Sequence, residues 1–171
     1  MSDGPSASAE IQTLYELYAQ DVYRYAWFNL DTSAVAEDVV QEVYLRALGS
    51  WNSFRHDSSA KTWLIAIARN YIYDSYRKRK TEDAILQDYG VRTGNDEFTT
   101  TNDIMDLRDA LSRMKENYRQ AVILRYIQML SAKEAGAVLG WSEAKVRWTT
   151  HRGLQQLRGL LSSDDEEGDR Q

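Results

Sequence analysis

KTWLIAIARNYIYDSYRKRK, residues 61–80, repeats its apolar side chains at the spacing of an amphipathic helix. The face predicted to pack into a core carries Leu64, Ile67, Ala68 and Tyr71. A second line of side chains is mostly polar and carries Trp63, Asn70, Asp74 and Arg77. Four consecutive cations, residues 77–80, end the stretch. A basic helix with aromatic side chains between its charges is typical of nucleic-acid binding, although a solvated basic end that complements the helix dipole would have the same pattern.

The chain has the composition of a globular protein and lacks the residues of several kinds of site. It has 171 residues, 43% of them hydrophobic, a net charge of −5, two histidines and no cysteine. Disulfides and thiolate metal sites are excluded, and we expect no metal, no cofactor and no histidine-based catalytic centre. No apolar run approaches the roughly 20 residues that span a bilayer, and the first ten residues lack signal-peptide features, so we expect a cytoplasmic protein.

Charge is distributed unevenly along the chain. Residues 1–80 carry nine basic and ten acidic side chains, and residues 81–103 carry one and six. Residues 104–161 carry ten basic and five acidic side chains, and residues 162–171 carry one basic and five acidic side chains. Two blocks are thus separated by an acidic connector, and the second block is basic in a chain whose pI is about 5.1.

Helical spacing is confined to the two blocks, which predicts an all-α protein of two small helical domains joined by a flexible acidic linker. The first domain, residues 11–80, is predicted to contain helices at 11–29, at 34–48 and from Lys61, with a polar loop at 49–60. The linker covers residues 81–103, and the second domain covers residues 104–161. Residues 1–10 and the acidic tail, 162–171, are expected to be disordered.

Residues 131–152 carry the signals of a helix-turn-helix in the right order. Ser131 and Glu134 form a capping box, Gly140 ends a short helix, and Ser142 is placed to cap the next one. That helix is predicted to bury Val146, Thr150, Leu154, Leu157 and Leu161. Its opposite face is predicted to carry Lys145, Trp148, Thr149 and Arg152. This basic outward face favours a DNA-reading motif over a plain helical hairpin.

Four short sequence motifs follow one another along the chain. They are AEDVVQE at 36–42, the spaced pattern from Thr62 to Arg77, YR at 118–119 with LRY at 124–126, and HRG at 151–153. In these segments the chain resembles the extracytoplasmic-function (ECF, group 4) sigma factors of bacterial RNA polymerase, a branch of the sigma-70 family. The resemblance implies that residues 11–80 are sigma region 2, which binds the polymerase clamp and the minus-ten promoter element. It also implies that residues 104–161 are region 4, which binds the minus-thirty-five element.

The resemblance assigns expected roles to individual residues. One stripe on the second helix, turned away from the core-facing valines, would dock on the clamp helices of the polymerase: Asp38, Gln41, Glu42 and Leu45. The loop and the third helix would capture a flipped minus-ten base and hold the opened strand: Asn52, Phe54, Arg55, Lys61, Thr62, Trp63, Arg69, Asn70, Tyr73 and Arg77. The recognition helix would contact minus-thirty-five DNA: Ser142, Lys145, Arg147, Trp148, Thr149, His151 and Arg152. The linker would lie in the polymerase cleft: Asp88, Asp96 and Glu97.

Some of these residues fit a second interpretation. Acids near a helix start also complement the helix dipole, and a tryptophan such as Trp63 also serves as a core anchor. Trp148 is unusual on a recognition face, and it could fill packing space beside Ala135 or contact a thymine methyl group. Gly136, inside the first helix of the motif, should cost about 1 kcal/mol relative to alanine. The chain departs from the family pattern at Ala60, Lys115, Ala135, Gly136 and Thr149.

A sigma factor is a binding protein without catalytic chemistry. The partners it implies are core RNA polymerase, promoter DNA and an anti-sigma factor, with no small-molecule substrate. The main alternative is a stand-alone helix-turn-helix transcriptional regulator whose first domain senses a ligand or dimerises. A nuclease would need clustered carboxylates to hold Mg²⁺, and the clustered acids lie instead in the linker and the tail.

Overall fold

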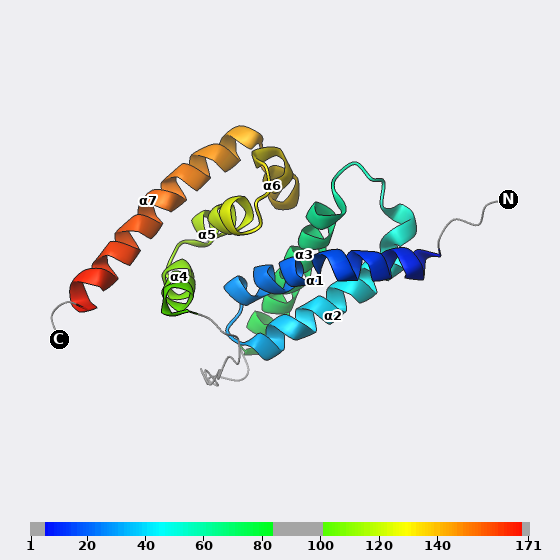
Figure 1. The fold of residues 1–171 in the computed structure, drawn as a ribbon, viewed down its shortest axis with the longest axis horizontal. Coiled ribbons are helices and arrows are strands. Elements are labelled where there is room, and N and C mark those ends of the chain that lie inside the picture. Colours follow the sequence, from blue (N-terminus) through cyan, green and yellow to red (C-terminus); the bar gives the residue numbers. More distant parts are fainter. Residues whose placement is uncertain (1–5, 84–100, 169–171) are drawn as a thin grey trace. The chain divides into compact units, whose positions relative to one another are not determined.

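The computed structural model describes the backbone of residues 6–83 and 101–168 and the side chains of residues 6–80 and 101–163 (Figure 1). Every regular element in these ranges is helical, and the chain separates into two compact units, residues 1–96 and 97–171. The prediction of an all-α protein with two helical domains is therefore confirmed. Most of the predicted linker, including Asp88, Asp96 and Glu97, lies outside the described residues. Among the described helices, none combines the length and apolar character that crossing a membrane requires.

The described part of unit 1 contains three α-helices, each longer than its sequence pattern predicted: α1 (Ala7–Asn29), α2 (Ser33–Ser50) and α3 (Ala60–Asp83). Helix α1 starts after Ser6, whose Oγ accepts a hydrogen bond from the backbone N–H of Ala9 at 3.3 Å. The expectation of disorder through residue 10 is wrong from Ala7 onward, because a serine cap starts the helix before its first core residue. Thr32 caps α2 in the same way, accepting from Val35 at 3.3 Å.

The core of unit 1 lies where the three helices meet. Buried side chains come from all three helices and include Val22, Tyr25 and Ala26 of α1, Val39, Val43 and Ala47 of α2, and Leu64 and Ala68 of α3. On α3, Ile65 and Ile72 are also buried, whereas Ile67 and Tyr71, which were predicted to be in the core, are half-buried. Because α3 contacts both α1 and α2, its buried face is rotated from the one that periodicity alone indicated.

Within residues 101–168, unit 2 contains four α-helices and one π-helical turn: α4 (Asn102–Ser112), α5 (Glu116–Val122), η2 (Ile123–Ile127), α6 (Ala132–Leu139) and α7 (Glu143–Gly168). The expectation of a disordered tail from residue 162 is wrong as far as Gly168, where α7 ends. The Oγ atoms of Ser162 and Ser163 each donate to a carbonyl one turn earlier, both at 2.8 Å. The apolar stripe ends at Leu161, but a helix continues beyond its stripe when no residue breaks it.

Helices α5 and α7 pack closely in unit 2 because residue 153 is glycine. A Cβ atom on Gly153 would lie 2.8 Å from Val122 Cγ2 and 3.1 Å from the carbonyl oxygen of Tyr118. Contacts as short as these leave no room for a larger side chain. Around this crossing, the described side chains of unit 2 that are fully buried include Leu111, Ile123, Leu124 and Val146.

A widened turn joins α5 to the helix-turn-helix. In η2, the backbone N–H of Gln128 donates to the carbonyl of Ile123 at 2.9 Å, the i to i+5 bond of a π-helix. The next residue, Met129, has a φ of +57° and is 76% exposed. Arg125 closes the turn by donating from its guanidinium to the carbonyl of Leu130 at 2.6 Å. This turn leads the chain to Ser131, the first residue of the helix-turn-helix.

Candidate nucleic-acid and polymerase interfaces

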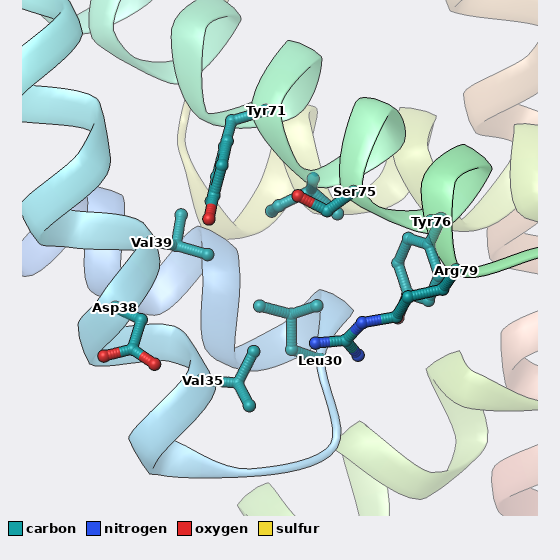
Figure 2. A pocket seen from close by; sticks show the side chains of 9 residues that line it. Leu30, Val35, Asp38, Val39, Tyr71, Ser75, Tyr76 and Arg79 are labelled. Carbon is teal, nitrogen blue, oxygen red and sulfur yellow. The ribbon is translucent and has the colours of Figure 1, made fainter. Parts of the chain in front are cut away.

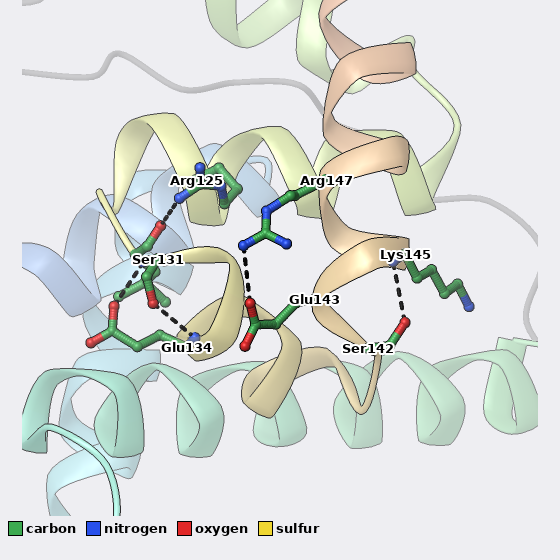
Figure 3. A network of polar contacts seen from close by, with 8 residues as sticks. Arg125, Ser131, Glu134, Ser142, Glu143, Lys145 and Arg147 are labelled. Atoms are coloured by element: carbon green, nitrogen blue, oxygen red, sulfur yellow. Dashed lines mark hydrogen bonds and ion pairs between the residues drawn. The ribbon is translucent and has the colours of Figure 1, made fainter.

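The helix-turn-helix in unit 2 forms as its capping residues predict (Figure 3). Ser131 Oγ accepts from the N–H of Glu134 at 3.1 Å, and Glu134 Oε2 accepts from the N–H of Ser131 at 2.7 Å. Gly140 ends α6 with a φ of +70°, a conformation that suits glycine. Ser142 Oγ then accepts from the N–H of Lys145 at 3.2 Å and caps α7. The predicted capping box, turn and second cap are all confirmed.

Gly136 has a structural role that its helix propensity did not suggest. Its carbonyl accepts a hydrogen bond from the N–H of Trp141 at 3.0 Å, which closes the turn. A Cβ atom on Gly136 would lie 2.6 Å from the carbonyl oxygen of Trp141, well inside normal contact. Glycine is therefore needed here because the backbone of the turn lies directly against α6. The expected cost of about 1 kcal/mol relative to alanine holds only for a helix without this neighbour.

The exposed face of α7 carries most of the cations that were predicted to contact the minus-thirty-five element. The side chains that lie in solvent are those of Ser142, Lys145, Arg147, Trp148, His151 and Arg152. Lys145 Nζ lies 4.3 Å from the centre of the Trp141 ring, and Arg152 Cζ lies 5.0 Å from that of Trp148. Arg147 forms an ion pair with Glu143 at 3.0 Å (Figure 3). Two cations of this face are thus held against aromatic rings.

Thr149 and Trp148 lie differently from what the sequence predicted. The prediction that Thr149 is on the DNA-binding face is wrong, because the side chain is only 3% exposed. Thr149 lies three positions after the buried Val146, which places both on the inner face of α7. Trp148 is 57% exposed, so it does not fill packing space beside the buried Ala135.

An aromatic cluster gathers in unit 1 where the loop after α2 meets the start of α3. The Phe54 and Trp63 rings stack with centroids 4.4 Å apart and an interplanar angle of 21°. Trp51, in the 3₁₀ turn η1 (Trp51–Ser53), lies 5.9 Å from Trp63, and His56 lies 4.4 Å from Phe54. His56 has a φ of +58°, which turns the loop back toward the cluster. Trp51 and His56 were not among the individually predicted site residues, because only the folded loop brings them into the aromatic cluster.

The other predicted minus-ten residues divide into exposed and internal side chains. Asn52 and Arg55 are exposed on the loop, and Asn70 and Arg77 are exposed on α3. Two half-buried side chains also form a pair, because the guanidinium of Arg69 lies 4.4 Å from the centre of the Tyr73 ring.

Two predicted minus-ten residues have internal partners instead. Thr62 is 2% exposed, and its hydroxyl lies 2.8 Å from that of Ser59, which also caps the Thr62 N–H at 3.1 Å. The prediction that Thr62 lies on the DNA-binding surface is therefore wrong, because this threonine belongs to the cap of α3. Lys61 forms an ion pair with Asp21 of α1 at 3.7 Å, which links the start of α3 to α1.

The predicted docking stripe on α2 borders two separate hollows. Gln41 and Leu45 line an apolar groove with Tyr15 of α1, and Leu45 is 66% exposed. Asp38 instead lines a smaller pocket, whose other side carries Arg79 of α3 (Figure 2). Glu42 forms an ion pair with Arg46 at 2.9 Å. The four residues share one side of α2, but only Gln41 and Leu45 face the groove.

Tyr44 fixes the floor of this groove. Its hydroxyl donates to the carbonyl of Leu14 at 3.1 Å, and its ring lies edge-on to that of Tyr15 at 4.9 Å. Burial raises the pKa of the Tyr44 hydroxyl well above its ordinary value, so this group keeps its proton and remains a donor. The hydrogen bond therefore ties α2 to α1 beneath the exposed Leu45.

The described residues contain no cluster of His, Asp or Glu side chains that could hold a metal ion. The linker residues Asp88, Asp96 and Glu97 lie outside the part of the chain that the structure describes.

Both units match models of a known protein family. Residues 14–82 match Sigma-70 region 2, and residues 104–157 match Sigma-70, region 4. The ECF RNA polymerase sigma factor SigX of Bacillus subtilis is 36% identical over 157 residues, which is 86% of this chain and 81% of the relative. The chain belongs to the ECF sigma factors. The ECF sigma factor SigM of the same organism is 32% identical, over 89% of this chain and 95% of the relative.

A solved structure of a sigma factor resembles this one. The sigma factor RpoE of Bartonella quintana, crystallised with the anti-sigma factor NepR, has a TM-score of 0.78 and 25% identity. The match covers 91% of this chain and 98% of RpoE. This ECF sigma factor is an alternative sigma factor that directs promoter recognition at transcription initiation, and it is not an enzyme. The match of residues 14–82 to region 2 argues against a stand-alone regulator with a sensor or dimerisation domain.

Proposed function

We propose that the two units of this sigma factor share promoter recognition, unit 1 holding the opened minus-ten strand and unit 2 reading the minus-thirty-five duplex. One observation carries the proposal: each unit has its own surface on which cations lie beside aromatic rings. In unit 1 the pair is Arg69 and Tyr73, and in unit 2 it is Arg152 and Trp148. Cations hold phosphates, so both surfaces suit nucleic acid. The aromatic ring in unit 1 can also hold an unstacked base of the opened strand.

The minus-ten role rests on the stacked rings of Phe54 and Trp63. A base released from the duplex gains a partner when it stacks on an aromatic ring, and such a contact is worth about 1–3 kcal/mol. The exposed Asn52 and Arg55 flank these rings in the loop, where an amide and a cation are available to a base edge and a phosphate. Asn70 lies exposed further along α3, where it would meet the adjoining part of the strand.

Polymerase docking is assigned to the groove between α1 and α2. Its lining includes Ile11 and Tyr15 of α1 and Gln41, Leu45 and Leu48 of α2. An exposed leucine on a groove wall that contains a glutamine suits a helix with an apolar stripe and a polar edge. Glu42 and Asp38 do not line this groove, although they share its side of α2. Their charges would steer the approach of a partner rather than become buried against it.

A transcription assay with core RNA polymerase tests the assignment of the two units. Arg152→Ala in unit 2 should weaken binding to a duplex promoter. Asn70→Ala in unit 1 should slow opening of a duplex promoter but leave a pre-opened promoter nearly unaffected. Gln20→Ala, an exposed change on α1 at a residue with no proposed contact, serves as the control and should behave as the wild type. Identical defects of both variants on the pre-opened promoter would refute the division of roles.

The acidic linker is proposed to lie in the polymerase cleft, against basic walls that nucleic acid otherwise uses. The proposal rests on its composition, six acidic side chains against one basic over residues 81–103. Changing Asp88, Asp96 and Glu97 to Asn or Gln removes charge and keeps the length. The yield of abortive transcripts should change while binding to both promoter elements stays intact. If this variant gives the same yield of abortive transcripts as the wild type, the linker is better explained as a passive tether.

An anti-sigma factor is a further proposed partner. Support comes from RpoE, which is 25% identical and was crystallised with the anti-sigma factor NepR. The exposed Leu45 in its groove is the surface that such an inhibitor would have to cover to keep polymerase away. Purification of the tagged protein from resting and stressed cells should recover an inhibitory protein in one of the two states. Recovery of polymerase alone in both states would contradict the proposal.

We also assign the protein to the cytoplasm, where RNA polymerase acts. Cell fractionation should find it in the same fraction as polymerase, and its presence in a secreted fraction would contradict this assignment.

A further inference from the structure

Trp148 is an unusual side chain for its position on the recognition helix. It is 57% exposed, and the exposed residues around it on α7 include Lys145 and Arg152. Val146, Thr149 and Thr150 face the interior, so Trp148 contributes little to the core of unit 2. A large apolar ring on a basic, solvent-exposed face indicates a partner that has both negative charge and an apolar group.

The ring of Trp148 is held in place by its neighbour one turn later. Arg152 Cζ lies 5.0 Å from the ring centre, within the range of a cation–π contact. Residues i and i+4 lie on the same side of a helix, so the helix itself keeps these two side chains together. The guanidinium and the indole therefore form a single unit on the surface of α7, with most of the indole still exposed.

We propose that Trp148 and Arg152 form a specificity-determining pair, in which Trp148 contacts the C5-methyl group of a thymine and Arg152 reads the neighbouring guanine. This inference rests on the proposed reading of the minus-thirty-five duplex by unit 2. The thymine methyl is the apolar group that base pairs present in the major groove, and an arginine fork fits the O6 and N7 acceptors of guanine. Trp148 and Arg152 offer one side chain of each kind.

The two side chains lie close enough together to reach neighbouring base pairs. Four residues of α-helix advance about 6 Å along the axis, whereas neighbouring base pairs are about 3.4 Å apart. Arg152 reaches back over the indole, which shortens the separation between the two reading groups to the 5.0 Å observed. A thymine directly beside a guanine is therefore a step that both side chains can reach.

Sequence selection by the complete holoenzyme tests the pair. Templates with a randomised minus-thirty-five region are bound to core polymerase carrying the wild type, Trp148→Ala, Trp148→Phe or Arg152→Lys. The wild type should select a thymine beside a guanine. Trp148→Ala should lose the thymine and keep the guanine, Trp148→Phe should retain part of the thymine preference, and Arg152→Lys should lose the guanine.

Removal of the methyl group alone makes the test specific. Replacing the selected thymine with deoxyuridine should weaken wild-type binding about fourfold, the effect of burying one methyl group. The same replacement should leave the affinity of Trp148→Ala unchanged, and deoxyuridine in the spacer serves as the control. Thermal unfolding of Trp148→Ala should match that of the wild type, because the side chain is exposed.

Three results would overturn the inference. Trp148→Ala could weaken all sequences equally and select the same site as the wild type, which would make the ring a non-specific contact. Deoxyuridine could weaken both proteins by the same factor, which would place the methyl contact elsewhere. A wild-type holoenzyme that selects no minus-thirty-five sequence would remove the proposed role of unit 2 itself, and the pair with it.

Discussion

Gly136→Ala should destabilise unit 2, although alanine is the better helix former. Residue 136 lies inside α6, where replacing glycine with alanine normally gains about 1 kcal/mol. Here the added Cβ would lie 2.6 Å from the carbonyl oxygen of Trp141, whereas ordinary contact begins near 3.4 Å. The obstacle is backbone, which cannot rotate away as a side chain can. The turn between α6 and α7 must therefore move.

The size of the effect follows from two costs and one gain in the free energy of unfolding. Inserting a methyl group into a filled site typically costs about 1–3 kcal/mol. Moving the turn also weakens the 3.0 Å hydrogen bond from Trp141 to Gly136, which is worth about 1 kcal/mol. After the gain in helix propensity is subtracted, we expect a net loss of about 1–3 kcal/mol in the free energy of unfolding of unit 2.

Hydrogen exchange of the full-length protein measures this loss where it occurs. In Gly136→Ala, amide protons in peptides from α6 and α7 should exchange faster. The exchange rate should rise tenfold for about each 1.4 kcal/mol lost from the free energy of unfolding of unit 2. Peptides from α1 to α3 should be unchanged. Gly159→Ala is the matched control, because this helical glycine has no atom within 4 Å of its added Cβ, and it should gain up to about 1 kcal/mol. A Gly136→Ala variant that is as stable as the wild type would refute the reasoning.

The remaining predictions use single exposed residues. Leu45→Ala should weaken binding to core polymerase and leave thermal unfolding nearly unchanged, and unaltered polymerase affinity would count against the groove. Lys145→Ala should lower minus-thirty-five affinity and reduce the slope of its salt dependence by about one, as measured by titration at several salt concentrations. Met129→Gly should stabilise unit 2 by about 1 kcal/mol in chemical denaturation, because it relieves a φ of +57°, and a loss of stability would show that the methionine side chain matters more than its backbone.

Local signals predicted much of unit 2. The residues that cap and end helices act on neighbours three or four positions away, so Ser131 with Glu134, Gly140 and Ser142 could be interpreted from the sequence alone. The two-domain division followed from the change in charge and periodicity near residues 81–103, and the family motifs then supplied the function.

Features that depend on distant neighbours could not be predicted in this way. Gly136 looked unfavourable because its reason, the carbonyl of Trp141, comes from a turn that the helix pattern does not contain. Thr62 and Thr149 were placed on surfaces because threonine suits either side of a helix, and only packing determines which. Similarly, His56 joins the aromatic cluster through a positive φ that nothing in the residue type requires.

The π-helical turn η2 constrains how the length of this chain can vary. Residues 123–127 contain one more residue than an α-helical path of the same rise would use. Deleting one residue there would restore a regular α-helix without breaking it. Every later residue would then be rotated by about 100° around the helix axis. Ser131 would leave the position from which it starts α6, and the exposed face of α7 would point elsewhere. The segment before the motif therefore cannot change in length without displacing the motif.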